Sequence, residues 1–172
     1  GDLPSVLAAV ASLQPVPGRM QSVANTLGVQ VVVDYAHTPD ALEKALQALR
    51  PQVAGRLLVV FGCGGDRDPA KRAVMGRVAC AAADAVVLTS DNPRSEDPQA
   101  ILDDIQRGCQ GVALVEADRA AAINLAIDQA QPGDCVLIAG KGHEAYQIIG
   151  DQRCAFSDVD CAAVALQRRT AS

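Results

Sequence analysis

Four segments of the sequence combine charged or amide side chains with glycine or proline. They are Asp34-Tyr35-Ala36-His37-Thr38-Pro39, Gly62-Cys63-Gly64-Gly65-Asp66-Arg67-Asp68, Asp91-Asn92-Pro93-Arg94 and Gly140-Lys141-Gly142-His143-Glu144. The third segment ends in an arginine, whose planar guanidinium binds a carboxylate or a phosphate through two parallel N–H bonds. These residue types indicate a site for a charged small molecule.

Each of these segments follows an apolar run typical of a buried β-strand. Strands are predicted at residues 29–34, 56–61, 85–90, 111–115 and 134–139, and the segments between them show helical spacing of apolar residues. This alternation predicts an α/β fold, a Rossmann-like doubly wound and mostly parallel sheet. Ligands of such sheets bind beyond the carboxyl ends of the strands, so the four polar segments are expected at one edge.

Proline and turn residues mark further boundaries. Thr38-Pro39, Asp68-Pro69 and Asp97-Pro98 each place a capping side chain before a proline, which predicts helices with proline at the first helical position. Residues 146–156 are expected to form a C-terminal hairpin or an antiparallel edge strand around Gly150-Asp151. A closing helix is predicted at residues 158–168.

The amino-terminal residues are expected to belong to a different domain from the rest of the chain. Residues 3–13 have helical spacing, and Pro15-Val16-Pro17-Gly18 is a stiff stretch that suits an interdomain linker. We therefore expect residues 1–17 to be the end of a preceding domain with its linker, and residues 18–172 to form one domain.

Composition narrows the function classes. The 172 residues carry a formal net charge of -5, with no basic stripe of the kind that nucleic acids require. No window is long and apolar enough for a membrane span, and no signal peptide is present at residue 1, so a cytoplasmic location is expected. The six cysteines form no CxxC pair and are expected to be reduced thiols, not metal ligands.

Each candidate segment also has a purely structural interpretation. Gly62 to Arg67 departs from the dinucleotide fingerprint GxGxxG because Arg67 replaces the third glycine, which leaves a glycine-rich turn capped by Asp68. Gly140-Lys141-Gly142 lacks the Walker spacing and its hydroxyl, and is also compatible with a strand-end turn. His37 is compatible with a surface histidine, and Arg94 with a solvated side chain after an Asn-Pro turn.

Taken together with Gly18-Arg19-Met20, the four segments resemble in order and spacing the C-terminal domain of the Mur ligases. The resemblance runs from about Arg19 to Arg168. Its most specific part is the Asp-Asn-Pro-Arg tetrad, which in this family is typical of enzymes that take meso-diaminopimelate.

The resemblance implies part of an ATP-dependent amide ligase of cytoplasmic peptidoglycan synthesis. In that reaction the D-glutamate γ-carboxylate of UDP-MurNAc-L-Ala-D-Glu is phosphorylated, and the diaminopimelate amine attacks the acyl phosphate. ATP and Mg²⁺ would be bound mainly by a central ATPase domain with a P-loop, of which residues 1–17 would be the end. The chain alone is expected to be inactive and to hold no catalytic or metal-binding residue.

The resemblance also implies site residues. The diaminopimelate-binding positions are Arg67, Asp91, Asn92, Pro93, Arg94, Gly140 and Glu144, and the nucleotide-binding positions are Arg19, Asp34 and His37. Arg94 and Asn92 are expected to hold the second carboxylate that lysine lacks, while Glu144 suits an ammonium. Lys141 and His143 receive no role.

Two other functions remain as alternatives. The first is a stand-alone module that binds a small molecule or a dinucleotide, which the incomplete GxGxxG pattern weakens. The second is a folylpolyglutamate-type ligase domain, in which the complete Asp-Asn-Pro-Arg tetrad would be unexpected.

Overall fold

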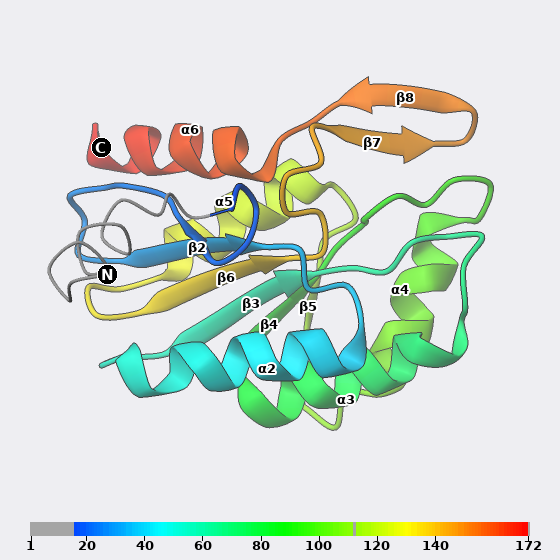
Figure 1. Cartoon of the computed structure of the whole chain (residues 1–172), viewed down its shortest axis with the longest axis horizontal. Helices are drawn as coiled ribbons and strands as arrows, with labels where there is room; N and C mark the ends of the chain where they lie inside the picture. The colour runs from blue at the N-terminus through cyan, green and yellow to red at the C-terminus, as the bar shows by residue number, and fades with distance from the viewer. Residues whose placement is uncertain (1–15, 112, 172) are drawn as a thin grey trace, which may run out of the picture.

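A six-stranded sheet with helices on both faces forms the body of the molecule (Figure 1). The computed structural model describes residues 16–111 and 113–171. The strand order is β1-β2-β6-β3-β4-β5, and every pairing is parallel except that of β1 with β2. The strands are β1 (Gln21–Ser22), β2 (Gln30–Asp34), β3 (Leu57–Phe61), β4 (Ala85–Leu88), β5 (Leu114–Val115) and β6 (Cys135–Ala139).

The central strands are buried on both faces, which explains their uninterrupted apolar sequences. All five residues of β3 and all five of β6 are buried. Side chains alternate between the faces, so Leu57, Val59 and Phe61 enter one core cluster. Leu58 and Val60 enter the other. The two clusters make a three-layer molecule with the sheet in the middle.

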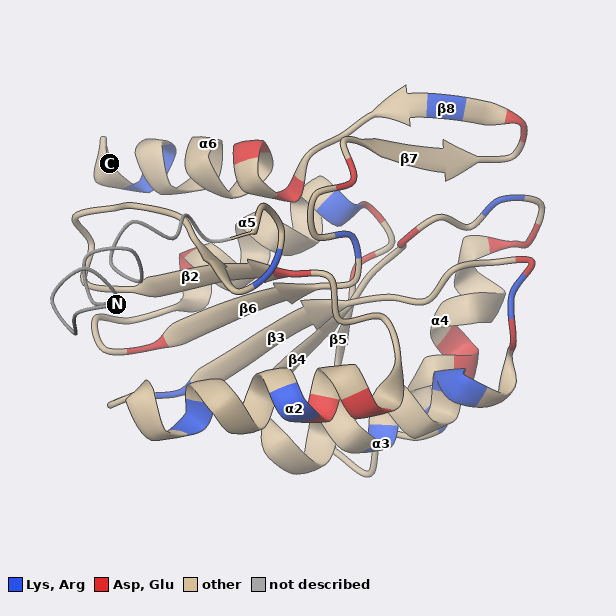
Figure 2. Ribbon diagram, viewed as in Figure 1, with Lys and Arg blue, Asp and Glu red and all other residues tan. Residues whose placement is uncertain are grey.

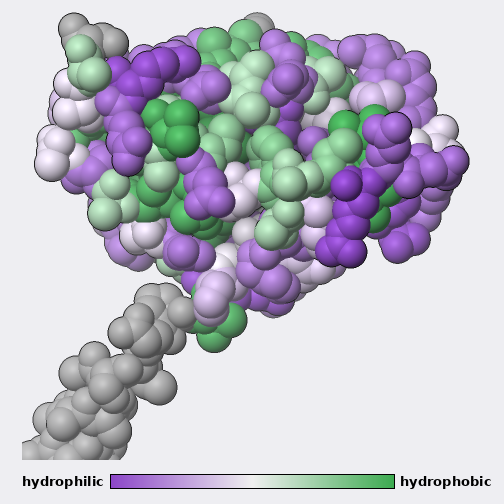
Figure 3. Space-filling model, turned by 90° about the horizontal axis from the view of Figure 1, so that it is seen from above, coloured by the Kyte–Doolittle hydropathy of each residue, from purple (hydrophilic) through white to green (hydrophobic). Residues whose placement is uncertain are grey.

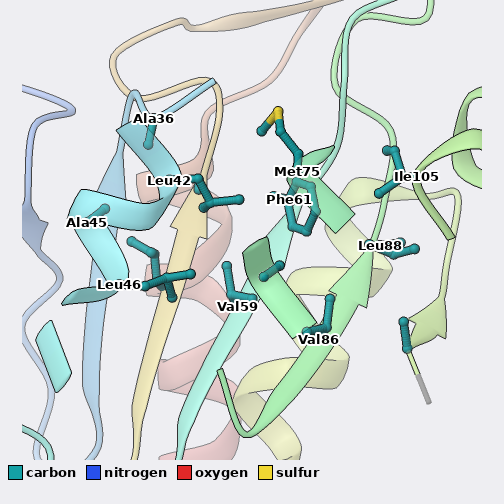
Figure 4. Packing of buried hydrophobic residues seen from close by; sticks show 14 of the residues in the cluster. Ala36, Leu42, Ala45, Leu46, Val59, Phe61, Met75, Val86, Leu88 and Ile105 are labelled. Carbon is teal, nitrogen blue, oxygen red and sulfur yellow. The ribbon is translucent and has the colours of Figure 1, made fainter. Parts of the chain in front are cut away.

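The helices divide between the two faces. α2 (Pro39–Leu49), α3 (Ala70–Ala82) and α4 (Pro98–Gln106) cover one face, while α5 (Arg119–Gln129) and α6 (Asp158–Thr170) cover the other. Figure 4 shows the first face in detail, where Met75 of α3 lies beside Phe61 and Leu88 of the sheet. Burial of these side chains is the main stabilising contribution to the domain.

The position of β6 determines which loops meet. The chain passes from β2 through β3 and β4 to β5 with α2, α3 and α4 on one face, and α5 then returns on the other face so that β6 enters between β2 and β3. The carboxyl ends of β2, β6, β3 and β4 therefore lie next to one another. In Figure 1 they point to the right-hand edge of the sheet.

A separate hairpin, β7 (Tyr146–Ile149) and β8 (Gln152–Ala155), stands beside this edge. It contacts the loop after β4 through an isolated bridge between Arg94 and Ile149. Seen from above, hydrophobic and hydrophilic residues are mixed over the face that carries α6, and the end near the hairpin is mostly hydrophilic (Figure 3). No helix in residues 16–111 and 113–171 has the length and hydropathy of a membrane span.

The structure confirms the predicted fold class, including the C-terminal hairpin, but several elements differ in detail; β4, for example, ends at Leu88, two residues before its predicted end. The antiparallel strand β1 was not predicted, because its two residues are polar and carry no strand pattern. β5 has two residues of the expected five and lies at the sheet edge, where it pairs with β4 alone. α3 begins at Ala70, one residue after the expected start, although Asp68 Oδ1 still accepts a hydrogen bond from Ala70 N. The predicted helix at 3–13 lies outside the described residues.

Candidate functional site

A cavity of about 470 Å³ opens at the carboxyl edge of the sheet. Its wall comes from the loops after β2, β3, β4 and β6, together with the start of α3 and the start of β7. The lining residues are Tyr35, His37, Thr38, Gly62, Cys63, Gly64, Arg67, Asp68, Lys71, Asp91, Asn92, Arg94, Gly140, Glu144 and Tyr146. Segments far apart in the sequence thus meet where a ligand of a parallel sheet is expected.

The cavity contains most of the residues expected to bind the amino acid. Arg67, Asp91, Asn92, Arg94, Gly140 and Glu144 all line it. Pro93 does not line it: this residue is buried, and its carbonyl accepts a hydrogen bond from Glu96 N. Of the three expected nucleotide-binding residues, only His37 lines the cavity.

Arg94 has an unusual backbone conformation. Its φ is 53°, in the left-handed region that residues other than glycine rarely adopt. The hairpin holds it there, because Arg94 N donates to Ile148 O at 3.1 Å and Gly150 N donates to Arg94 O at 2.7 Å. Backbone strain of this kind is retained where surrounding contacts fix it, and it concentrates at functional sites.

The guanidinium of Arg94 is only partly occupied by the protein. Nη1 donates to Gly65 O at 2.8 Å and to Asn92 O at 3.4 Å. Within the described part of the chain, Nε and Nη2 donate to no protein acceptor. The neighbouring Gly64 leaves room for this group, since a Cβ there would lie 2.9 Å from Nη1. A half-buried fork with two free donor nitrogens can bind an anionic group.

Charges of both signs alternate around the cavity, and Figure 2 shows them along the same loop edge. Arg67 is exposed, and its Nη1 donates to the carbonyl of Asp66 at 3.1 Å. Lys71 donates to the carbonyl of His37 at 2.8 Å. The carboxylates of Asp91 and Glu144 lie on the same wall. Alternating cations and carboxylates suit a ligand that carries ammonium and carboxylate groups itself.

Asn92 contributes more to the wall than the sequence predicted. Its Nδ2 donates to Glu144 Oε2 at 3.2 Å, and its Oδ1 accepts hydrogen bonds from Lys141 Nζ and Ile148 N, both at 2.9 Å. The amide therefore joins the loop after β4 to the loop after β6 and to β7. One N–H of Nδ2 remains after the bond to Glu144.

Further ion pairs hold the loops in place. Arg72, which is 3% exposed, donates to Glu96 at 2.9 Å and to Asp104 at 3.0 Å. The Arg72 guanidinium lowers the pKa of Glu96, which also accepts from Asp66 N. Hydrogen bonds from Ser95 likewise lower the pKa of Asp66. These carboxylates fasten the loop after β3 to the loop after β4.

The three expected nucleotide-binding residues gather around Tyr35. The Arg19 guanidinium lies 4.8 Å from the centre of the Tyr35 ring, and the His37 ring lies 4.6 Å from it. Asp34 is 7% exposed, and its two oxygens accept hydrogen bonds from Met20 N and Ala36 N, both at 2.8 Å. Asp34 thus holds the turn that carries Arg19. Burial is the largest cause of the raised pKa of Tyr35, followed by the charge of Glu144.

The cavity offers little nucleophilic or metal chemistry of its own. Burial raises the pKa of the Cys63 thiol to about 12, so the thiol stays protonated at neutral pH. All six cysteines are free thiols. In residues 16–111 and 113–171, His, Cys, Asp and Glu side chains form no group of three or more that would hold a metal ion.

Two lining residues lie outside the four polar segments of the sequence: Lys71 and Tyr146. Lys71 is the second residue of α3, directly after the loop that carries Arg67, and no helical spacing relates the two residues. Tyr146 enters from the hairpin, whose docking position no local pattern predicts.

The chain is similar to ligases of known sequence and structure. A family model described as Mur ligase, glutamate ligase domain, matches residues 18–142. The chain is 58% identical over 168 residues to the UDP-N-acetylmuramoyl-L-alanyl-D-glutamate--2,6-diaminopimelate ligase of Chromobacterium violaceum, covering 95% of this chain and 34% of that protein. The solved structure of a ligase with the same name superposes with a TM-score of 0.83 and 44% identity, over 99% of this chain and 35% of that one.

A more distant structure shares the fold alone. The bifunctional folylpolyglutamate synthase/dihydrofolate synthase of Yersinia pestis CO92 superposes with a TM-score of 0.61 at 24% identity, over 77% of this chain and 30% of that one. This chain spans about a third of the length of the curated relatives it matches, 34% for each of the first two. From the family model, which matches most of its length, the chain belongs to the Mur ligase family, in which it corresponds to the glutamate ligase domain.

Proposed function

We propose that this domain provides the amino-acid site of an ATP-dependent ligase that adds meso-diaminopimelate to UDP-MurNAc-L-Ala-D-Glu. The observation that carries the proposal is the Arg94 fork, which lines the cavity with two nitrogens that no described residue occupies. Arg67 and Glu144 line the same cavity. The relatives named above support the choice of reaction and of substrate.

The charges of the cavity suit the two ends of diaminopimelate. In our proposal Arg94 binds the carboxylate that lysine lacks, and the remaining N–H of Asn92 Nδ2 assists it. Arg67 binds the other carboxylate. Glu144 and Asp91 face an ammonium group, for which a carboxylate is the matching partner. Gly140, with a φ of 118°, brings backbone close to Asp91, since a Cβ there would lie 2.8 Å from Asp91 Oδ2.

Selectivity against lysine follows from the same contacts. Lysine would leave the half-buried guanidinium of Arg94 without its carboxylate partner, and loss of one partner of a buried ion pair costs about 3 to 5 kcal/mol. A difference of that size corresponds to a discrimination of roughly 150-fold to several thousandfold. The domain would thus select the amine before chemistry takes place.

Arg19, Asp34 and His37 are assigned to the nucleotide in this proposal. Arg19 and His37 both lie close to the Tyr35 ring, and Asp34 holds the turn that carries Arg19. ATP and Mg²⁺ would be held mainly by parts of the ligase beyond this chain. The domain boundary near residue 17 and the cytoplasmic location remain predictions.

The test is ligation by the full-length ligase with meso-diaminopimelate, L-lysine and L-ornithine offered in parallel at matched concentrations. We expect turnover with meso-diaminopimelate and a kcat/KM for the other two that is lower by about a hundredfold or more. Equal use of lysine would contradict the role of Arg94. Turnover with a glutamate acceptor in place of diaminopimelate would favour the folylpolyglutamate alternative.

A further inference from the structure

Lys141 is a lysine with no exposed surface. Its relative exposure is 0%, and it ranks among the largest fully buried side chains described. An ammonium group is costly to bury unless it is paired, and lysine is rarely found fully buried. The mechanism proposed above does not use it, and Lys141 does not line the cavity. Its burial therefore needs a reason of its own.

All the partners of Lys141 belong to the cavity wall. Its Nζ donates to Asn92 Oδ1 at 2.9 Å and to Glu144 Oε2 at 3.1 Å. The same Nζ lies 5.5 Å from the centre of the Tyr146 ring, a distance at which a cation attracts the aromatic face. Asn92, Glu144 and Tyr146 line the cavity and come from three different loops or strands. Lys141 thus connects these three lining residues without lining the cavity itself.

The two carboxylate oxygens of Glu144 differ in the hydrogen bonds that they accept. Oε2 accepts from Lys141 Nζ at 3.1 Å and from Asn92 Nδ2 at 3.2 Å. Oε1 accepts no hydrogen bond from residues 16–111 and 113–171. The carboxylate is consequently held by one oxygen, and the lone pairs of the other remain for a ligand.

The orientation of the Asn92 amide depends on the same cation. Oδ1 accepts from Lys141 Nζ and from Ile148 N, so both donors require an oxygen at this position. Nδ2 must then face Glu144. Without the ammonium of Lys141, Asn92 Oδ1 keeps only the hydrogen bond from Ile148 N. Glu144 Oε2 then keeps only the hydrogen bond from Asn92 Nδ2.

We infer that Lys141 is a positioning residue for the ammonium-binding end of the cavity, where it fixes the Glu144 carboxylate and the Asn92 amide for the amino acid. The inference rests on the proposed function. Two effects of the cation oppose each other, because its charge also repels a bound ammonium. Orientation outweighs repulsion here, since the charge of Lys141 is largely neutralised by Glu144 at 3.1 Å and separated from the cavity by its partners.

The test uses the full-length ligase with Lys141→Met, which keeps the length of the side chain and removes the ammonium. We expect the KM for meso-diaminopimelate to rise about tenfold or more, as for the loss of hydrogen bonds to a charged group, while the KM for ATP changes less than about twofold. Lys44→Met is the matched control, because Lys44 pairs with Asp40 on the exposed side of α2. It should leave both KM values unchanged.

The pathway through Glu144 is tested by combining substitutions. Glu144→Gln alone should raise the diaminopimelate KM, and adding Lys141→Met should raise it little further, because both changes break the same contact. Lys141→Gln, which retains an N–H donor, should recover part of the affinity. This variant also serves if Lys141→Met fails to fold, as judged by its thermal midpoint.

Three outcomes would overturn the inference. An unchanged or lower diaminopimelate KM in Lys141→Met would show that repulsion outweighs positioning. Fully additive effects of Lys141→Met and Glu144→Gln would show that Lys141 does not act through Glu144. An unchanged KM in Glu144→Gln would instead remove Glu144 from the amino-acid site, so the proposed site itself would fail, and the inference with it.

Discussion

Two arginines near the same sheet edge use their guanidinium groups in opposite ways. Arg119 on α5 is buried, and all three of its nitrogens donate: Nε and Nη2 to the two oxygens of Asp158, Nη1 to Ser90 O and Nη2 also to Ala139 O. Both side chains of the Arg119 and Asp158 pair are 0% exposed. Arg94 uses one nitrogen for protein contacts and lines the cavity with the others.

The difference shows how the fold separates stability from binding. Arg119 joins the ends of β4 and β6 to α6, so its bonds are complete before any ligand arrives. Arg94 is held by its backbone contacts to Ile148 and Gly150, and its side chain keeps free donors. A guanidinium with satisfied bonds stabilises the fold, whereas one with free bonds stabilises a complex.

Removal of Arg119 should give the largest loss of stability. Arg119→Met leaves the Asp158 carboxylate buried without its partner, which costs about 3 to 5 kcal/mol of unfolding free energy. Urea unfolding of the chain measures this value. The double variant with Asp158→Leu should recover much of the loss, because no unpaired charge remains. A loss below about 1 kcal/mol would show that the pair is not structurally required.

Removal of the Arg94 side chain should affect binding and spare the fold. In the full-length ligase, Arg94→Ala should raise the diaminopimelate KM about a hundredfold, an effect of about 3 kcal/mol, while the KM values for ATP and the nucleotide sugar change far less. Arg94→Lys keeps the positive charge but not the planar guanidinium, so its diaminopimelate KM should lie between those of the parent enzyme and Arg94→Ala. A uniform rise for all three substrates would refute a role in specificity.

Substitution of the adjacent Gly64 and Gly65 should separate an effect on binding from an effect on stability. A Cβ at Gly65 would meet the backbone carbonyl of Pro93, so Gly65→Ala should cost about 1 to 3 kcal/mol of stability. A Cβ at Gly64 would come closest to Nη1 of Arg94, 2.9 Å away, and would meet no backbone atom nearer than 3.8 Å, so Gly64→Ala should displace the end of this side chain at little cost in stability. We expect a severalfold higher diaminopimelate KM for Gly64→Ala. Thermal midpoints and steady-state kinetics of both variants measure the two effects, and equal midpoints would contradict the prediction.

Acid should lower the stability of the fold by protonating a structural carboxylate, Asp134, at the opposite end of the strands from the cavity. Burial alone would raise the pKa of Asp134, but hydrogen bonds from Gln131 N, Arg56 N and the Arg56 guanidinium outweigh it and lower this pKa below its ordinary value. Stability from Asp134 is therefore present above about pH 4 and is lost as pH falls through the lower folded pKa.

Asp134→Asn should remove about 1 kcal/mol of stability at pH 7 and flatten the acid dependence below about pH 4. Urea midpoints between neutral and acidic pH measure this dependence. Asp103→Asn, whose carboxylate accepts one exposed hydrogen bond from Gln99, is the matched control. Parallel acid profiles for the parent chain and Asp134→Asn would contradict the assignment.

The candidate site could be predicted in part because parallel strands impose one direction on their loops. The apolar runs of β2, β3, β4 and β6 indicated strands, and each carboxyl end then had to lie at the same edge. The sequence was therefore sufficient to gather Arg67, Arg94 and Glu144 into one region. The family resemblance added their assignment to an amino acid, which remains a proposal.

Local sequence patterns did not predict which hydrogen-bond partner each polar side chain has. Asn92 was expected to be a donor to the ligand, yet most of its amide is occupied by Lys141, Glu144 and Ile148. Arg119 lies within a predicted helical segment and gave no sign of its buried pair with Asp158, 39 residues away. Such pairings join distant parts of the chain, and no periodicity encodes them.

Hydrophobic periodicity, caps and glycine positions thus determined the elements of this Mur ligase domain, because these signals act over a few residues. The tertiary structure alone decided that β6 enters between β2 and β3, which brings Gly140 to Glu144 against the loop after β4. It also decided that Arg119 has all its bonds satisfied and Arg94 does not. Hydrogen bonds are short and directional, so which donors stay free for a ligand depends on the packed arrangement of the whole chain.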